Sequence, residues 1–528
     1  MSRALVPGTY VEEAVAGAHP IAGVATSIAA FVGRAPRGPL DGDPASPVLL
    51  NDFASFQRRF GALEPAFPMA YAVRDFFANG GRRALVVRLY KAVPGDAVRA
   101  RIRIPGLPLV AASAGAWGNH LRARVEACAS PAEAGLFHLE IRDTAGGLQE
   151  RFEALSLTEG PRRADRVLAA ESSLMRLDPA LPLPASQPPP AHAPVAAGAD
   201  PWLQDDASTG VAADDEAGDG ALLDEAAYLG SAEDRTGLHA LRRTDLFNLL
   251  CIPPDARGGD TAPAVHREAL GLCVERRAML VVDPPAAWRD AEAIARDSHR
   301  FPGSIGIEGL AARNAVLYFP RLHEPDPMLA GEVDTFAPCG AVAGVMARTD
   351  HALGVWRTPA GLDATLECVP GLDVAVTDAD NALLNPLGIN CLRDLPSAGP
   401  VVWGSRTLRG ADAQADEYKY LPVRRLALHI EESLLRGTQW AAFEPNGEPL
   451  WARLRLDVDD FMHALFRKGA FRGSKAGQAY FVRCDAQTTS QADVAMGLVN
   501  IEVGFAPLRP AEFVVIHVGQ AAGRAADG

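Results

Sequence analysis

The chain has 528 residues, of which 48% are hydrophobic and 22% are charged. These values are typical of a soluble protein that is long enough for several domains, each with its own core. The net charge is −14, but residues 177–234 contain twelve acidic residues and no Lys or Arg, which leaves −2 for the rest. This balance disfavours nucleic-acid binding through a broadly basic surface.

Several other protein classes are disfavoured by missing signals. The N-terminus has no basic stretch followed by an apolar run, so a secretory signal is not expected. No segment approaches the roughly 20 apolar residues of a membrane helix. The seven cysteines are scattered without a Cys-x-x-Cys pair, which argues against a zinc site and a disulfide scaffold. We expect synthesis in a reducing cytoplasm.

The chain opens with an isolated strand. Residues 4–15, "ALVPGTYVEEAV", contain Pro7 and Gly8, which stop a helix, and then residues that favour extended backbone. A lone strand does not stay ordered in water because its backbone groups need a ladder. The segment therefore needs a partner, and none is close in the sequence.

A buried strand and two helices are predicted next. The apolar segment 20–40 with its Gly and Pro residues indicates a strand followed by a loop. Residues 51–61 predict a helix with Asn51 as N-cap. Residues 67–81 predict a second helix, with Pro68 in its first turn and Asn79-Gly80 at its end. Residues 83–90 read as a strand.

The composition then changes twice. Residues 91–176 hold short β-like runs at 100–106, 120–129 and 136–143, which predict a small, mostly β domain. Residues 177–235 are rich in Pro and Ala and then acidic. Such a segment cannot bury enough surface to fold alone, so we expect a linker or an exposed loop.

From residue 244 the pattern is regular. Apolar strands at 245–254, 278–285 and 314–322 alternate with helical segments at 262–277, 287–301 and 338–356. This alternation predicts a parallel sheet with helices on both faces.

The last 130 residues predict a further domain. Helices are expected over 421–437 and 448–469, each with an apolar stripe. Strands are expected over 479–485, 498–505 and 512–518.

Two aspartates raise the possibility of an enzyme. Asp255 and Asp283 follow the carboxyl ends of two predicted parallel strands, the edge at which α/β proteins bind ligands. No dinucleotide fingerprint, P-loop or nucleophile elbow accompanies them, and "FRGSKAG" (471–477) has the wrong Gly spacing for a phosphate loop. A structural role, with Asp capping a turn and the following prolines ending the strand, is the favoured interpretation.

Other polar clusters are equally ambiguous. His120, His266 and His463 belong to no metal motif and are expected to be packing or surface residues. The acidic tract is either a solvated loop or a segment that recruits a partner. A basic cluster between 467 and 483 is either a solvated helix end or a docking surface for an acidic protein; the residues alone favour the former. Its members are Arg467, Lys468, Arg472, Lys475 and Arg483.

The two ends of the chain suggest exchange between subunits. The strand over 512–518 is apolar on both faces and could form a hairpin with 498–505 in the same chain. Alternatively, strands at both termini could pair with sheet edges of neighbouring copies. Head-to-tail exchange does not close and generates a helical array.

Seven motifs in a fixed order cover both ends and much of the middle of the chain. They are "VPGTYVEE", "IAGVATSIAAFVGRAPRGP", "PMAYAVRDFFANGGRRALVVRL", "AGAWGNHLRARV", "GTQWAAFEPNGEPLWARLRLDVDDFMHALFRKGAFRG", "AYFVRCD" and "VGFAPLRPAEFVVIHV". In these motifs the sequence resembles the tail sheath proteins of contractile phages and phage-tail-like injection systems. The insert around 178–235 has no counterpart in this pattern.

This resemblance implies a structural, non-catalytic subunit. Copies would form a metastable helical or stacked-ring sheath around an inner tube protein, and contraction would drive the tube through a target envelope. Baseplate and terminator or cap proteins are implied as further partners, without cofactors, nucleic acid or membrane insertion. We expect the subunit to be made in the bacterial cytoplasm and built into a phage tail or tail-like particle; whether the particle leaves the cell stays open.

The sequence thus predicts an α/β multidomain fold with exchanged terminal strands. The expected parts are an extended N-terminal arm (1–20), the first part of the α/β core (21–90), an inserted β-rich outer domain (91–176), the Pro-rich acidic linker or loop (177–235), the second part of the core (236–397), a tube-facing C-terminal domain (398–510) and a C-terminal arm strand (511–528).

Two sets of site residues follow from the resemblance. The expected inter-subunit strand residues are Val6, Thr9, Tyr10, Val11, Glu12, Val15, Glu512, Phe513, Val514, Val515, Ile516 and Val518. The candidate tube contacts are Arg467, Lys468, Arg472 and Lys475. The alternatives are an α/β hydrolase-like enzyme and a structural tube protein of the same fold that does not contract.

Overall fold

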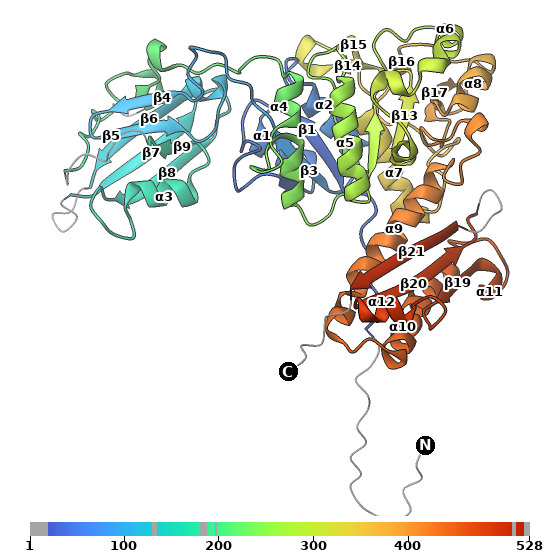
Figure 1. The fold of residues 1–528 in the computed structure, drawn as a ribbon. Coiled ribbons are helices and arrows are strands. Elements are labelled where there is room, and N and C mark those ends of the chain that lie inside the picture. Colours follow the sequence, from blue (N-terminus) through green and yellow to red (C-terminus); the bar gives the residue numbers. More distant parts are fainter. Residues whose placement is uncertain (1–18, 129–134, 180–186, 196–197, 509–513, 522–528) are drawn as a thin grey trace, which may run out of the picture.

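The computed structural model describes residues 19–128, 135–179, 187–195, 198–508 and 514–521, and of residues 514–521 only the backbone. A central α/β domain lies between a β-rich outer domain and a smaller C-terminal domain, and each has its own hydrophobic core (Figure 1).

The central sheet has eight strands. In spatial order they are β18 (Gly399–Val402), β17 (Asn390–Leu395), β13 (Ala315–Phe319), β12 (Met279–Val282), β11 (Leu249–Cys251), β1 (Ala29–Gly33), β3 (Ala84–Arg88) and β2 (Val48–Leu50). The six inner strands are parallel, with Ala29 opposite both Leu249 and Ala84, and the two edge strands are antiparallel. Strands β1, β3, β11, β12 and β13 are buried along their whole length, which explains their continuous apolar sequences.

Helices cover both faces of this sheet. One core contains residues of α1 (Phe53–Phe60), α2 (Pro68–Ala78) and α7 (Cys339–Leu353). The opposite core contains residues of α4 (Glu225–Leu229), α5 (Pro263–Glu275), α6 (Ala291–Arg296) and α8 (Asp378–Leu384). Helix α7 packs closely on α2 because Gly340 and Gly344 lack side chains: a Cβ at these positions would lie 2.1 Å from Ala72 O and 2.6 Å from Phe76 O.

Within its described residues, the outer domain has two small sheets and one α-helix. The first sheet has the order β4 (Arg101–Ile104), β5 (Leu107–Ala111), β9 (Met175–Leu177), and the second β10 (Thr209–Gly210), β6 (Leu121–Ala127), β7 (Phe137–Asp143), β8 (Gln149–Leu155). Helix α3 (Ala164–Glu171) contributes to the same core. Burial alternates strictly along β7, so one face of that sheet lies on the core.

The C-terminal domain places helices against a three-stranded antiparallel sheet. Its elements are α9 (Leu421–Gly437), α10 (Glu448–Arg467), α11 (Ala476–Ala479), β19 (Tyr480–Arg483), α12 (Gln491–Ala495), β20 (Leu498–Phe505) and β21 (Val514–Ala521). The sheet order is β19-β20-β21, with Val503 opposite Ile516. In the single chain, the C-terminal strand thus forms the in-chain pairing with β20.

The remaining elements are short. A third small sheet has the order β15 (Glu332–Phe336), β14 (Leu322–Asp326), β16 (Gly371–Leu372). The 3₁₀ helices in the described part of the chain are η1 (Ala116–His120), η3 (Pro201–Leu203), η4 (Ala213–Asp215), η5 (Gly237–Arg243), η6 (Asp297–Arg300), η7 (Gly303–Ile305), η8 (Leu310–Asn314), η9 (Pro327–Leu329), η10 (Asn385–Leu387), η11 (Asp412–Gln414) and η12 (Gln439–Phe443). Among the helices of the described residues, none has the length and apolar character needed to cross a membrane.

Three details differ from the sequence-based expectations. The N-cap of α1 is Asp52 rather than Asn51, because the Asp52 carboxylate accepts the Ser55 N–H at 2.6 Å. The helix expected over 287–301 is shorter, since α6 ends at Arg296 and continues as η6. Residues 399–402, expected in the C-terminal domain, form β18 of the central sheet because they pair with β17 as a hairpin.

The acidic segment, expected to be a linker or an exposed loop, is partly packed into the outer domain. Within residues 198–219, Trp202, Ser208 and Asp215 are buried, and β10 pairs with the edge of β6. Asp215 Oδ1 accepts Arg103 Nη2 at 2.7 Å, and Ala207 O accepts Arg124 Nη1 at 2.7 Å. The segment does not need a core of its own because strands of the outer domain supply its partners.

A buried arginine joins the outer and central domains. Arg88, at the end of β3, donates Nε to Ala35 O at 2.7 Å, Nη1 to Gly38 O at 2.9 Å, and Nη2 to Pro36 O at 3.1 Å and Ala114 O at 2.9 Å. Burial lowers the pKa of Arg88 to about 10. One side chain thus holds the loop after β1 against the outer domain.

A buried ion pair joins the C-terminal domain to the central domain. Arg425 of α9 donates Nη1 to Asp350 Oδ1 at 2.8 Å and Nη2 to Asp350 Oδ2 at 2.6 Å, and Nη2 also reaches Thr26 O at 2.9 Å. The two side chains are 3% and 2% exposed. The contact ties together α9, α7 and the segment that precedes β1.

Asp350→Asn should therefore lower the free energy of unfolding by about 3–5 kcal/mol, because it leaves the buried Arg425 charge without a counter-ion. Urea denaturation followed by tryptophan fluorescence measures this loss. The double variant Asp350→Asn/Arg425→Met is the control and should lose less, since it leaves no unpaired charge. A loss below about 1 kcal/mol in the single variant would contradict the assigned role.

Candidate assembly surfaces

Asp255 holds backbone and an ion pair in place. It follows β11, and Arg34 follows the neighbouring strand β1, so the two meet where the order of the parallel strands reverses. Arg34 Nε lies 2.8 and 2.9 Å from the two Asp255 oxygens, and Leu223 N donates to Asp255 Oδ2 at 2.7 Å. Burial raises the pKa of Asp255, and the Leu223 and Arg34 hydrogen bonds oppose this. The crevice that would hold a ligand in an enzyme thus holds an ion pair and the chain entering from the outer domain.

Asp283 is a helix cap. Its Oδ1 accepts the Cys339 N–H at 2.8 Å at the start of α7. Burial raises the pKa of Asp283 to about 6, and the Cys339 contacts oppose this rise. Its second oxygen has no hydrogen-bond partner within the part of the chain that the structure describes. The structure therefore gives both aspartates structural roles.

The histidines are packing or surface residues. His266 is buried, with Nδ1 2.9 Å from Ile305 O, and burial lowers its pKa. His120 is exposed, and His463 lies 3.4 Å from the Tyr480 hydroxyl. Outside the gaps in the described ranges, no group of three His, Cys, Asp or Glu side chains could hold a metal ion.

The basic cluster is an exposed surface after α10. Arg467, Lys468, Arg472 and Lys475 are all exposed, and none makes an ion pair with another described residue. Arg483 differs, since it lies 3.5 Å from Glu502. We call the four unpaired cations the basic loop. Because the four cations are exposed and unpaired within the described chain, an acidic partner could form new ion pairs with them.

The N-terminal arm residues Val6, Thr9, Tyr10, Val11, Glu12 and Val15 lie outside the described residues. The described chain begins at His19, whose ring stacks on Trp440 with centroids 4.4 Å apart. Val24 N then donates to Ser433 Oγ at 3.1 Å, so the chain runs antiparallel to α9. The arm therefore joins the rest of the chain at η12, beside the end of α9.

The C-terminal arm residues fall partly in β21. Val514, Val515, Ile516 and Val518 belong to this strand, whereas Glu512 and Phe513 lie outside the described residues. Strand β21 pairs with β20 along one side and is an edge of the sheet in the described chain. Helix α9 and η12 both contact it. Residues 19–24, which we call the root of the N-terminal arm, and the open edge of β21 thus lie in the same domain.

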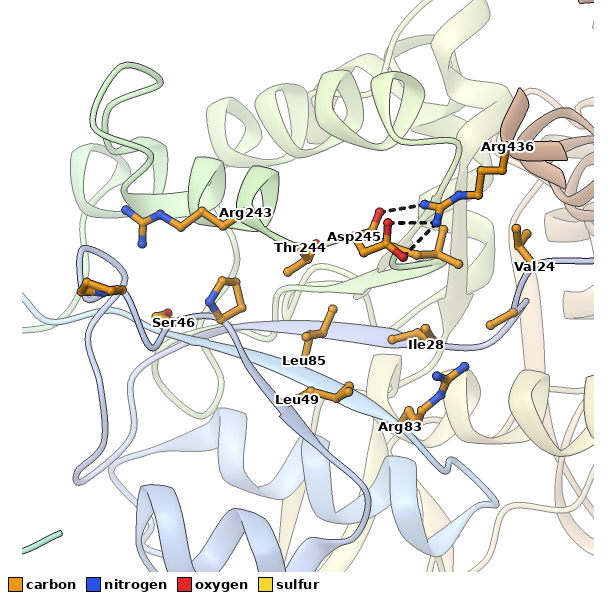
Figure 2. Close-up of a pocket in the computed structure, with 14 residues that line it drawn as sticks. Val24, Ile28, Ser46, Leu49, Arg83, Leu85, Arg243, Thr244, Asp245 and Arg436 are labelled. Carbon is orange, nitrogen blue, oxygen red and sulfur yellow. Dashed lines mark hydrogen bonds and ion pairs between the residues drawn. The ribbon is translucent and has the colours of Figure 1, made fainter. Parts of the chain in front are cut away.

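Two surface features have no signal in the sequence. Phe443, the last residue of η12, is 92% exposed although an aromatic residue in this position reads as core. An open cavity of about 530 Å³ lies where the amino ends of β1 and β3 meet α9 (Figure 2). Across it, Arg436 Nη1 binds both carboxylate oxygens of Asp245 at 2.8 and 2.9 Å. Among the described residues that line the cavity, Arg436 comes from α9 and the others come from the central domain or the segment before β1.

The fold resembles known structures along almost the whole chain. No family model and no curated protein matches the sequence. The helical sheath of the anti-feeding prophage (AFP) in its contracted state is 22% identical, with a TM-score of 0.52 over 97% of this chain and 99% of that chain. The contracted PVC sheath complex of an extracellular contractile injection system is 18% identical, with a TM-score of 0.55 over 98% and 99%. A sheath tail protein from Listeria innocua is 11% identical, with a TM-score of 0.63 over 95% and 96%.

The chain has the tail sheath fold. The resemblance inferred from the sequence motifs is confirmed at this level, and the matched structures are sheath proteins rather than enzymes. The sheath fold also agrees with the structural roles of Asp255 and Asp283, since Asp255 is held in an ion pair and Asp283 is buried at the start of α7.

The cost of ionising the buried Asp283 carboxyl can be tested by varying the pH. Its pKa is higher in the folded chain than the unfolded value near 3.8, so the folded state loses stability as pH rises from about 4 to about 6. Asp283→Asn cannot ionise but still offers an oxygen to the Cys339 N–H. We expect it to raise the free energy of unfolding at pH 7 by on the order of 1–3 kcal/mol and to have little effect at pH 4.

Urea unfolding at the two pH values measures this effect. Asp255→Asn is the matched comparison and should destabilise at pH 7, because it leaves Arg34 buried without its counter-ion. A loss of stability at pH 7 in the Asp283 variant would contradict the prediction.

Proposed function

We propose that the protein is the sheath subunit of a contractile, phage-tail-like particle, polymerising around an inner tube and shortening to drive the tube through a target envelope. The observation that carries this proposal is a single fold shared over at least 95% of the chain with three sheath proteins. Two of these come from sheaths solved in a contracted state. Baseplate and cap proteins would bind the two ends of the polymer.

Exchange of terminal strands between copies would link the subunits of the polymer. The eight residues of β21 form a continuous ladder with β20, from Phe505 opposite Val514 to Leu498 opposite Ala521. The β21 strand of another copy would make the same ladder, so exchange loses no backbone hydrogen bonds. The free edge of β21 can then accept an N-terminal arm from a further copy. Such links would hold copies together while they move.

The basic loop is proposed as the contact with the tube. Its four cations are exposed and make no ion pair with a described residue, so they are available to an acidic tube surface. Exposed ion pairs are individually weak and are screened by salt. A contact of this kind suits a tube that the sheath must release.

Deleting residues 1–15 tests the exchange of arms. The variant should remain folded, because the described core begins at His19, but it should no longer form sheaths, because the incoming strand is missing. Negative-stain electron microscopy measures assembly, and circular dichroism checks the fold. Deletion of residues 1–5 alone is the control and should assemble. Normal sheaths from the longer deletion would refute arm exchange.

Charge reversal tests the tube contact. Replacing Arg467, Lys468, Arg472 and Lys475 by Glu should reduce sheath growth on the tube far more than growth without it. Light scattering with and without preformed tubes gives the two rates. The control reverses four exposed cations of the central domain that likewise make no ion pair with a described residue, Arg82, Arg83, Arg267 and Arg300. Equal loss with and without tubes would show that the basic loop does not bind the tube.

A further inference from the structure

Phe443 is held outward by a rigid support. Thr438 Oγ1 donates to Leu434 O at 2.8 Å at the end of α9, and Ala441 of the same 3₁₀ turn is 2% exposed. On the other side, Asn446 donates Nδ2 to Leu498 O at 2.9 Å and accepts Trp451 Nε1 at 2.9 Å. Both ends of the turn are fixed, so the exposure of Phe443 belongs to a defined conformation.

Phe443 lies beside the residues that hold the start of the described chain. Trp440, three residues earlier, is covered by His19 and lies 5.0 Å from the Arg453 guanidinium. The turn that carries both aromatic residues contacts β21, the open edge strand of the sheet. Phe443 therefore lies at the junction of three features: the end of α9, the root of the N-terminal arm and the strand edge.

We propose that Phe443 is the anchor on which the N-terminal arm of a second copy binds. This inference rests on the proposed function, and it adds the residue that receives the arm. Eighteen residues precede His19, enough to span roughly 60 Å when extended, which exceeds the length of β21 about twofold. Their sequence supplies Tyr10, Val11 and Val15, the aromatic and β-branched residues that pack on an exposed ring. Exposed aromatic residues on fixed supports are typical anchors of protein interfaces.

Other exposed apolar side chains of the C-terminal domain do not share the position of Phe443. Leu456 and Met496 are 56% and 61% exposed in the same domain, yet neither belongs to the turn that contacts β21 and the arm root. They serve as matched controls, because substituting either one by Ala removes exposed apolar surface that lies outside η12.

A photo-crosslinker tests the contact directly. p-Benzoylphenylalanine is placed at 443, 456 or 496 in the full chain, sheaths are assembled from mixed ¹⁴N and ¹⁵N copies, and cross-linked peptides are identified by mass spectrometry. We expect position 443 to link to residues 1–18 with mixed isotopes, which identifies a second copy, and positions 456 and 496 not to do so. Links within one copy only, links to another protein, or no links in assembled sheaths would overturn the proposal.

Truncating the Phe443 side chain tests how much it contributes to the free energy of assembly. Phe443→Ala should raise the critical concentration for assembly by roughly tenfold, whereas Phe443→Trp, Leu456→Ala and Met496→Ala should stay within about twofold of the unaltered chain. An unchanged critical concentration in Phe443→Ala would overturn the anchor role. If the unaltered chain formed no sheath, the proposed function would fail and this inference with it; normal assembly without the expected link refutes the inference alone.

Discussion

The bidentate contact between Arg425 and Asp350 holds the C-terminal domain against the central domain. It fixes α9 on the central domain, and Arg425 also holds Thr26 O, so the segment that leads from the N-terminal arm into β1 is held by the same side chain. The elements of the proposed junction then follow along α9: His429 against Gly23, Ser433 with Val24 N, and η12 with Phe443. Together with the Arg436–Asp245 and Arg277–Glu432 ion pairs, this contact holds the arm root and the edge of β21 in a fixed direction relative to the central sheet.

A second arginine has the corresponding role on the other side of the molecule. Arg88 binds four carbonyl oxygens with one planar group, which a lysine could not reproduce because its single nitrogen lacks the fork geometry. The buried guanidinium groups thus join three domains into one body. Under the proposed function, contraction would then occur by changes between copies, because movement within a copy would expose a buried charge.

Much of this fold could be predicted from local sequence, and the failures have a common cause. The apolar runs at 279–282 and 315–319 identified the inner strands, because burial on both faces leaves that signal. Asp255 and Asp283 were located at the correct edge, but their partners Arg34 and Cys339 lie 221 and 56 residues away, so no local pattern shows the ion pair or the cap. Strand β14, "LHEPD", was missed because its buried Glu324 and Asp326 pair with Arg74 and Arg257, and a local pattern does not show such distant partners. Phe443 gave no signal because composition cannot distinguish a buried ring from an exposed one.

The basic loop and the C-terminal strand are coupled through the backbone. Arg472 N donates to Ala506 O at 2.9 Å, and Ala506 N donates to Ala479 O at 2.7 Å, so the first residue after β20 is held by the segment that carries the cations. In-chain and exchanged pairing of β21 form the same ladder, and the balance between them therefore depends on the connection that begins at Ala506. A tube surface that binds the basic loop would fix the start of this connection. Under the proposed function, all copies bound to the tube would then hold the start of this connection in the same orientation. Strand exchange between copies would therefore be more favourable on the tube than in solution.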